Sequence, residues 1–361
     1  MQRENLLEPG LQGGDSKGRY RTKKAALLVW LHTTTFLFGL GLLLLVMYWF
    51  GYRAVLDTLS QVGWGFLPII GLNVLRHFLR ASTLYLAVPP EHRNFKYRSA
   101  VAARFGGEAI SFLTFTGPFL GDATKALLLK KEISLTHGAT AVLIDDVLYY
   151  LSVLLMILAG VGAFVLFFES SNTSMGGALW ATVITSILIV AIIALAIGFK
   201  VTPLSRITSI LEKRGLAPNF LVKLSGSIHT VETNVFQFYH QRRADFFKLF
   251  AISSIVHVVS VCEVYLALKL LGLDSLWSTA FIIESLTKII NVVFSFVPGT
   301  IGVYEGGNSV ILAAVGYTAA VGVALALVRR VAILFSLFVG LVVLLWRTVD
   351  SGTKTFVGLD D

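Results

Sequence analysis

A series of long apolar stretches constrains this chain more than any other feature of its sequence. Six of them are uninterrupted, at 26–50, 64–88, 138–168, 178–199, 247–271 and 319–346. A helix needs about 20 apolar residues to cross the hydrocarbon core of a bilayer, and each stretch is long enough. Only 14% of the residues are charged and 55% are hydrophobic, whereas soluble proteins carry about 25% charged residues. The sequence therefore predicts an all-α integral membrane protein with about six transmembrane helices.

The basic residues predict how these helices are oriented. Lys and Arg gather before residue 25, within 89–104, within 200–248 and after Trp346, whereas the predicted outer loops hold only Arg53. Loops that stay in the cytoplasm carry the excess of positive charge, so both termini are expected there. The net charge of +9 then reflects topology and attraction to anionic lipid. We expect no nucleic-acid partner, because the basic residues are not interleaved with aromatic residues on one soluble module.

Two further apolar stretches, 99–129 and 277–316, are interrupted by proline and glycine. Pro118 and Pro298 stand at the interruptions. The distribution of basic loops is consistent only if each stretch returns to the side of the membrane from which it entered. Irregular backbone is tolerated at membrane depth where it is buried in protein or lines a water-filled cavity. The two stretches are therefore predicted to form re-entrant broken-helix hairpins.

The two interrupted stretches also resemble each other. When Pro118 is placed on Pro298 without gaps, charged positions match with reversed sign: Arg104 with Glu284, Glu108 with Lys288, and Lys125 with Glu305. A shift of one helical turn also brings Asp145 and Asp146 near Arg329 and Arg330. The hairpins enter from opposite sides, which predicts an inverted repeat with a substrate site at the repeat interface. We expect the reversed charges to neutralise one another between the halves, Glu108 with Lys288 and Lys125 with Glu305.

These features divide the chain into segments: a basic, disordered cytoplasmic tail at 1–24, a first membrane half at 25–199, a cytoplasmic linker at 200–246, a second membrane half at 247–346 and a cytoplasmic tail at 347–361. Apolar residues in the linker recur every three or four positions, as Leu221, Leu224, Ile228, Val231, Val235 and Phe238. This spacing places them on one face of a helix. The helix is expected to pack on the cytoplasmic ends of the spans; the alternative is a docking site for a lipid-synthesis enzyme.

Two motifs carry a family resemblance. They are the run VPGTIGVYEGG at 297–307 with LVRR at 327–330, and the earlier run from GGE at 106–108 to GDATKALLLKK at 121–131. Over about residues 26–346 the chain resembles the flippase-like transmembrane region of lysylphosphatidylglycerol synthases. The resemblance implies a stand-alone bacterial member of that family in the cytoplasmic (inner) membrane. No soluble aminoacyl-transferase domain is expected, because little sequence follows Trp346, so lysyl transfer is not expected either.

By position, the resemblance points to residues around each break: Pro118, Gly121, Asp122 and Lys125 in the first half, and Pro298, Gly299, Gly302, Glu305 and Arg329 or Arg330 in the second. Two positions depart from the family pattern. Asp122 stands where glutamate is usual, and Asp145-Asp146 stands where an acidic–basic pair is expected. These departures bear on which lipid is handled.

Charged side chains inside predicted spans are costly in a bilayer, and two interpretations of them stay open. Either they form structural ion pairs that hold the broken helices, or they contact an anionic lipid headgroup, because a guanidinium matches phosphate bidentately. We expect Arg329 or Arg330, helped by Lys125, to select anionic headgroups. The candidate substrate-binding and transport residues are Arg104, Glu108, Pro118, Gly121, Asp122, Lys125, Asp145, Asp146, Glu284, Lys288, Pro298, Gly299, Gly302, Glu305, Arg329 and Arg330.

Together these observations predict a lipid translocase that moves a phospholipid or a lipid-linked precursor between leaflets. The sequence lacks the phosphate loop GxxxxGK[ST], so ATP hydrolysis by this chain is not expected. No cofactor or metal site is expected, since Cys262 is the lone cysteine and the histidines are scattered over different spans. Two alternatives remain: an intramembrane transferase, with Asp145 and Asp146 beside Tyr149 and Tyr150, and a non-catalytic membrane partner of a lipid-synthesis enzyme.

Overall fold

The computed structural model describes residues 62–114, 117–168, 180–189, 203–214 and 219–357, together with Gly177 and Ala191. The predicted first span at 26–50, the tail at 1–24 and much of the predicted span at 178–199 lie outside the described residues. Within the described residues all regular structure is helical. The prediction of an all-α protein is therefore confirmed for this part of the chain.

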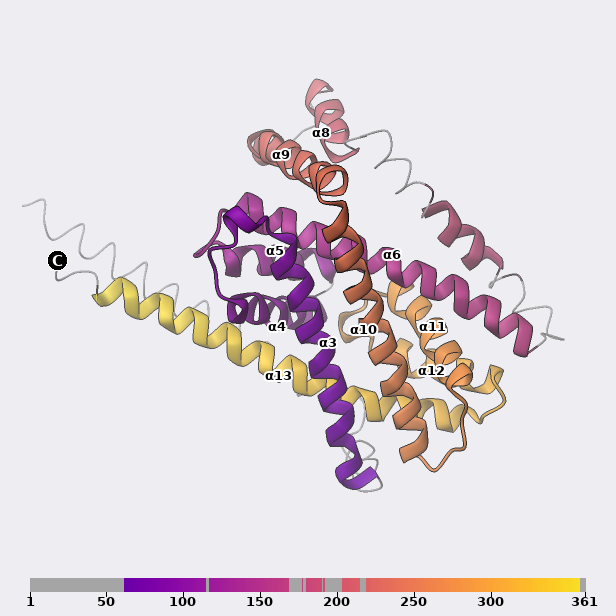
Figure 1. Ribbon diagram of the computed structural model, residues 1–361. Coiled ribbons are helices and arrows are strands. Elements are labelled where there is room, and N and C mark those ends of the chain that lie inside the picture. Colours follow the sequence, from indigo (N-terminus) through magenta and orange to yellow (C-terminus); the bar gives the residue numbers. More distant parts are fainter. Residues whose placement is uncertain are drawn as a thin grey trace, which may run out of the picture.

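The helices of the two membrane halves follow one another in the same order (Figure 1). The first half contains α3 (Phe66–Ala87), α4 (Tyr97–Leu113), α5 (Pro118–Leu129) and α6 (Leu135–Phe167). The second half contains α10 (Arg243–Leu270), α11 (Trp277–Val293), α12 (Val303–Ala314) and α13 (Ala319–Val357). The helix Trp180–Ile189, α8 (Pro203–Lys213) and α9 (Asn219–Gln241) lie between them in the sequence.

Three of the described helices are long and apolar enough to cross a membrane, namely α6, α10 and the Ala319–Arg347 part of α13. Together they make the chain a multi-pass integral membrane protein. Helix α3 has 22 residues, but Asn73, Arg76 and Arg80 interrupt its apolar sequence. Its crossing of the membrane, and the total number of spans, stay predictions.

Each interrupted stretch forms two short helices around its predicted break. The α4–α5 break contains Gly117 with φ +48°, and the α11–α12 break contains Gly299 and Gly302 with φ of +61° and +77°, a region that glycine adopts readily. Helices α4 and α5 lie antiparallel and close together, because a Cβ on Gly107 would stand 2.8 Å from the carbonyl oxygen of Gly121. The breaks at Pro118 and Pro298 are confirmed, whereas the direction from which either pair enters a membrane stays a prediction.

The long helix that ends each half packs against the broken helix pair of the other half. Helix α6 packs on α11 of the second half, and α13 packs on α4 of the first. Glycine makes both contacts close: Gly160 leaves no room for a Cβ against Ser285, and Gly340 leaves none against the backbone of Phe105. Helices α3 and α10 lie side by side at the centre, with α4–α5 on one side and α11–α12 on the other (Figure 1).

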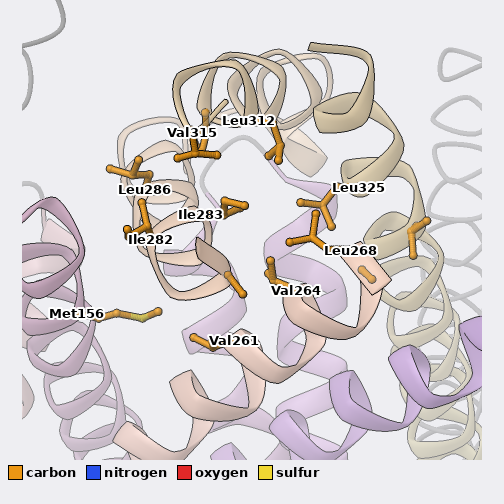
Figure 2. Packing of buried hydrophobic residues seen from close by; sticks show 14 of the residues in the cluster. Met156, Val261, Val264, Leu268, Ile282, Ile283, Leu286, Leu312, Val315 and Leu325 are labelled. Carbon is orange, nitrogen blue, oxygen red and sulfur yellow. The ribbon is translucent and has the colours of Figure 1, made fainter. Parts of the chain in front are cut away.

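Three apolar clusters hold this arrangement in the described residues: two large ones, and a small one between α4 and α13. The cluster of the second half is built from branched side chains of α10, α11 and α12, with Met156 of α6 and Leu325 of α13 beside them (Figure 2). The cluster of the first half contains many alanines and includes Val235 and Phe238 of α9. The linker helix α9 therefore packs on the first half, as its apolar spacing predicts. Leu221 and Leu224 lie outside the described side chains.

Candidate functional site

A cavity of about 740 Å³ lies between the halves, and side chains from all eight of their helices line it. Charged residues are frequent on its walls. The basic side chains are Arg76, Arg80, Arg104, Lys125, Lys288 and Arg329, and the acidic ones are Glu108, Asp122, Asp146 and Glu263. Basic side chains outnumber acidic ones on the walls themselves, and the carboxylates of Asp145 and Glu284 neutralise some of them from behind.

On the α3 side of the cavity, Arg80 is held by consecutive carboxylates of α6. Its Nη2 atom donates to Asp145 Oδ2 at 2.6 Å and to Asp146 Oδ1 at 3.0 Å. The guanidinium also lies 3.8 Å from the ring centroid of Tyr149, a favourable cation–π distance. Asp145 accepts a second hydrogen bond from Thr83 Oγ1. Asp145 is thus a fully buried counter-ion behind the wall, whereas Asp146 lines the cavity.

The corresponding helices of the second half, α10 and α13, carry the same kind of pair with reversed sign. Glu263 of α10 accepts from Arg329 Nε of α13 at 2.9 Å, and Arg76 Nη1 of α3 donates to the same carboxylate at 2.9 Å. Arg329 also lies 2.8 Å from Glu284. Glu263 was not among the predicted site residues, because no motif surrounds it in the sequence. Only the packing of α10 against α13 and α3 reveals its position.

The charged positions that match between the broken stretches pair within each helix pair. Arg104 binds Glu108 at 2.9 Å on α4, and Glu284 binds Lys288 at 2.8 Å on α11. Both pairs are spaced i, i+4, which brings side chains together on one helix face. The prediction that Glu108 pairs with Lys288 is therefore wrong. Its physical reason is that the partner one turn away is already within reach.

The second predicted cross-pair is corrected in the same way. Lys125 Nζ lies 2.7 Å from Asp122 and 3.7 Å from Asp146, both in the first half. Glu305 binds Arg330 of the second half at 2.6 Å. Lys125 and Glu305 are thus equivalent in position and opposite in charge, but each is neutralised inside its own half.

A polar contact also recurs between equivalent long helices. Ser152 Oγ of α6 lies 2.8 Å from His257 Nε2 of α10, and Ser336 Oγ of α13 donates to Asn73 Oδ1 of α3 at 2.7 Å. The positions 152 and 336 differ by 184, as do 73 and 257. The recurrence therefore extends beyond the charged residues.

Gly299, Gly302, Glu305 and Arg330 form a set of hydrogen bonds behind the cavity, which we call the latch. Arg330 is fully buried and donates to the Gly299 carbonyl at 2.6 Å as well as to Glu305. Glu305 Oε2 accepts the Gly302 N–H at 3.0 Å. Pro298 begins the short helical turn Pro298–Thr300 that these contacts hold. Gly299 and Thr300 of this group line the cavity and Arg330 does not, so Arg330 is placed as a structural residue.

At the first break, the predicted residues divide between packing and lining. Pro118 begins α5 and lines the cavity with Asp122 and Lys125. Gly117 meets the second break, since a Cβ there would lie 2.7 Å from the Ser295 carbonyl oxygen. Gly121 packs against α4 and does not line the cavity. The tips of the two helix pairs therefore touch each other beside the cavity.

Several basic groups in the cavity wall keep unused donors. The Nε atoms of Arg76, Arg80 and Arg104 are buried without a hydrogen-bond partner. A buried donor without an acceptor is unfavourable, so these guanidinium groups are incompletely hydrogen-bonded in the described structure. In the part of the chain that the structure describes, no group of three or more His, Cys, Asp or Glu is placed to hold a metal ion.

Comparison with known proteins agrees with this architecture. No curated protein and no solved structure matches the chain. A family model described as the lysylphosphatidylglycerol synthase TM region matches residues 36–340, which is most of the chain. The match confirms the resemblance seen in the two motifs around Pro118 and Pro298. The chain therefore belongs to the family of membrane proteins that this transmembrane region of lysylphosphatidylglycerol synthases defines.

Proposed function

We propose that this protein is a lipid translocase that moves a phospholipid or a lipid-linked precursor with an anionic headgroup between leaflets. One observation carries the proposal: a cavity of about 740 Å³ with mainly basic charged walls lies between the halves of a multi-pass membrane protein. A headgroup that crosses a bilayer must replace its hydration with protein contacts. Buried arginine donors offer phosphate such contacts in bidentate geometry.

The proposed translocase is an inverted repeat with two re-entrant helix pairs and both termini in the cytoplasm of a bacterium. The support is the recurrence of reversed ion pairs: Arg104–Glu108 against Glu284–Lys288. Transporters with inverted repeats place substrate sites at the repeat interface, and their broken helices line the site. The contact of α6 with α11 and of α13 with α4 agrees with such an interface.

The topology is testable at exposed positions. Asp274 lies in the loop between α10 and α11, and its side chain is fully exposed; Lys213 ends α8 and is exposed. In a protein without Cys262, Asp274→Cys is expected to react with an impermeant thiol reagent added outside cells. Lys213→Cys should react only after the membrane is permeabilised. Labelling of Lys213→Cys alone in intact cells would reverse the proposed orientation.

The geometry favours translocation over group transfer. Asp146, the acid closest in sequence to Tyr149 and Tyr150, is paired with Arg80 at 3.0 Å and lies 3.7 Å from Lys125. A general base must lie within hydrogen-bond reach of its nucleophile, and among the described residues no hydrogen bond joins Asp146 to the hydroxyl group of Tyr149 or Tyr150. We therefore propose no enzymatic step for this chain. A lipid-synthesis enzyme on the cytoplasmic face stays a proposed partner, supported by the exposed Ile207 and Ile210 of α8.

Transport is tested in vesicles that contain the purified protein. A fluorescent anionic phospholipid is placed in both leaflets, and a membrane-impermeant quencher then reports how fast the inner pool reaches the outer leaflet. The protein is expected to accelerate exchange of the anionic lipid well beyond that of a zwitterionic phosphatidylcholine, because the cavity walls are mainly basic. Protein-free vesicles are the control. Equal exchange with and without folded protein, for every anionic lipid tried, would contradict the proposal.

A further inference from the structure

We infer that the α4–α5 pair holds a phosphate-binding site formed by Arg104 and Lys125, and that Glu108 and Asp122 are counter-ions which the phosphate displaces. The inference rests on the proposed lipid transport and names the subsite at which the headgroup is held. It separates the charges that contact substrate from those that only hold the fold.

The two cations are buried in the protein and yet face the cavity. Arg104 and Lys125 are 8% and 4% exposed, and both line the cavity wall. Arg104 binds Glu108 only through Nη2, which leaves its other terminal nitrogen, Nη1, without a hydrogen-bond partner among the described residues. A phosphate oxygen is the acceptor that this unused N–H fits, because charge-assisted bonds to phosphate are the strongest that a guanidinium makes.

The counter-ions at this place differ from the other carboxylates around the cavity. The side chains of Glu108 and Asp122 are 43% and 30% exposed, whereas those of Glu263 and Glu284 are each 1% exposed. An exposed carboxylate can leave its cation and be solvated where it stands, but a fully buried one cannot. Phosphate can therefore replace Glu108 and Asp122 without stranding a buried charge, and it cannot replace the carboxylates of the second half.

Local packing keeps the two cations in place while their partners leave. The stem of Lys125 lies against Gly107, where a Cβ would stand 3.2 Å from Lys125 Cε. Gly107 is one turn along α4 from Arg104, so the two basic side chains share one part of the wall. Asp146, at 3.7 Å from Lys125 Nζ, stays as a second partner, and Arg80 holds it there. The site thus keeps its shape with or without phosphate.

Binding is measured on the purified full-length protein in detergent, so the result does not depend on transport. The probes are dihexanoyl phosphatidic acid, glycerol 3-phosphate, which lacks acyl chains, and dihexanoylglycerol, which lacks phosphate. We expect the phosphatidic acid to bind most tightly. Arg104→Gln and Lys125→Gln should each weaken its binding about tenfold, the scale of a lost charge-assisted contact. Lys130→Gln, at an exposed lysine just after α5, is the matched control and should bind as the parent protein does.

Substituting the counter-ions Glu108 and Asp122 should have the opposite effect on binding affinity. Glu108→Gln and Asp122→Asn remove competitors of the phosphate and should tighten binding of dihexanoyl phosphatidic acid several-fold. A simple loss of structure would weaken it instead, and thermal unfolding of each variant shows whether it is folded. Parent-like binding by folded Arg104→Gln, or weaker binding by folded Glu108→Gln, would overturn the inference. Equal affinity for glycerol 3-phosphate would overturn the assignment to a lipid.

These outcomes are separate from those of the transport assay. If the protein binds phosphatidic acid through Arg104 and Lys125 but does not accelerate lipid exchange, the phosphate site is supported and the proposed transport function is contradicted. If the protein accelerates lipid exchange but none of the variants alters phosphatidic acid binding, the transport function is supported and the phosphate site is contradicted.

Discussion

The α4–α5 and α11–α12 pairs occupy equivalent places in the two halves but differ in how their charges are exposed. On α4 the Glu108 side chain of the Arg104 pair is 43% exposed, whereas on α11 the Glu284 side chain of the Lys288 pair is 1% exposed. The spacing of the two pairs is the same and the sign is reversed. A repeated ion pair can thus be open to exchange in one half and be part of the fixed structure in the other.

The two helix pairs also close by different contacts. Gly107 and Gly121 bring α4 and α5 so near that neither has room for a Cβ. Between α11 and α12, Thr287 Oγ1 donates to Asn308 Oδ1 at 3.2 Å, and Arg330 ties the break to α13. Gly307 of α12 also leaves no room for a Cβ against Ile290 of α11. The first pair therefore closes by glycine packing, and the second combines glycine packing with directional polar contacts.

Neutralising one carboxylate in each half gives the largest expected contrast. Glu284 lies between Lys288 and Arg329 and is buried, so Glu284→Gln should lower the free energy of unfolding by about 3–5 kcal/mol. Glu108→Gln removes a half-exposed partner of the buried Arg104 and should lower it by less, about 1–3 kcal/mol. Thermal and denaturant unfolding in detergent measures both. Equal losses in the two variants would show that the halves are equally open.

A second variant series separates the charge of the latch from its shape. Arg330→Met leaves Glu305 buried without its cation and should lower the free energy of unfolding by about 3–5 kcal/mol. The double variant Arg330→Met with Glu305→Met should recover part of that loss, because no unpaired charge remains. Recovery is expected to be incomplete, since Glu305 also accepts the Gly302 N–H. No coupling between the two substitutions would disprove the latch.

Replacing glycine by alanine tests the packing of α6 on α11 and of α13 on α4. Gly160→Ala and Gly340→Ala each place a methyl group where α11 or α4 leaves no room, and each should lower the free energy of unfolding by about 1–3 kcal/mol. Gly162→Ala is the control, because nothing lies within 4 Å of a Cβ at that position. Similar losses at 160 and 340 would support equivalent interfaces; a loss at only one would break the comparison.

The smallest expected effect concerns the two equivalent serine contacts of the long helices. Ser152→Ala and Ser336→Ala remove the hydrogen bonds to His257 and Asn73. Each should lower the free energy of unfolding by about 0.5–1.5 kcal/mol. Unfolding curves of the two variants and their double variant provide the measurement. Losses that differ by much more than this range would mean that the two serines have different roles.

The few prolines and charged residues within the apolar sequence predicted where the helices break and which positions of the two halves correspond. The helices break at Pro118 and Pro298. Aligning the two stretches on these prolines without gaps identifies equivalent positions on α4 and α11. The partners of the charges could not be predicted in this way. A sequence match states which positions correspond, but the reach of a side chain and the spacing along its own helix decide which carboxylate it binds.

Burial was equally hidden from the sequence. Arg329 and Arg330 are neighbours in one motif, yet Arg329 lines the cavity and Arg330 lies behind it. Successive residues of a helix point about 100° apart, so only the neighbours of α13 decide which of the two faces the cavity. Glu263 is recognisable in the sequence as an acid on an apolar helix, but its partners Arg76 and Arg329 follow only from the packing.

Three ion pairs of the first half form within that half, and this has a consequence for how the protein is made. A ribosome delivers α3–α6 to the membrane before α10–α13 exist, and an unpaired charge at the bilayer centre costs about 2.5–3.5 kcal/mol on insertion scales. Arg80 meets Asp145, Arg104 meets Glu108 and Lys125 meets Asp122 without help from the later helices. The early polypeptide thus brings partners for these three cations, whereas Arg76 meets its partner Glu263 only after α10 has been made.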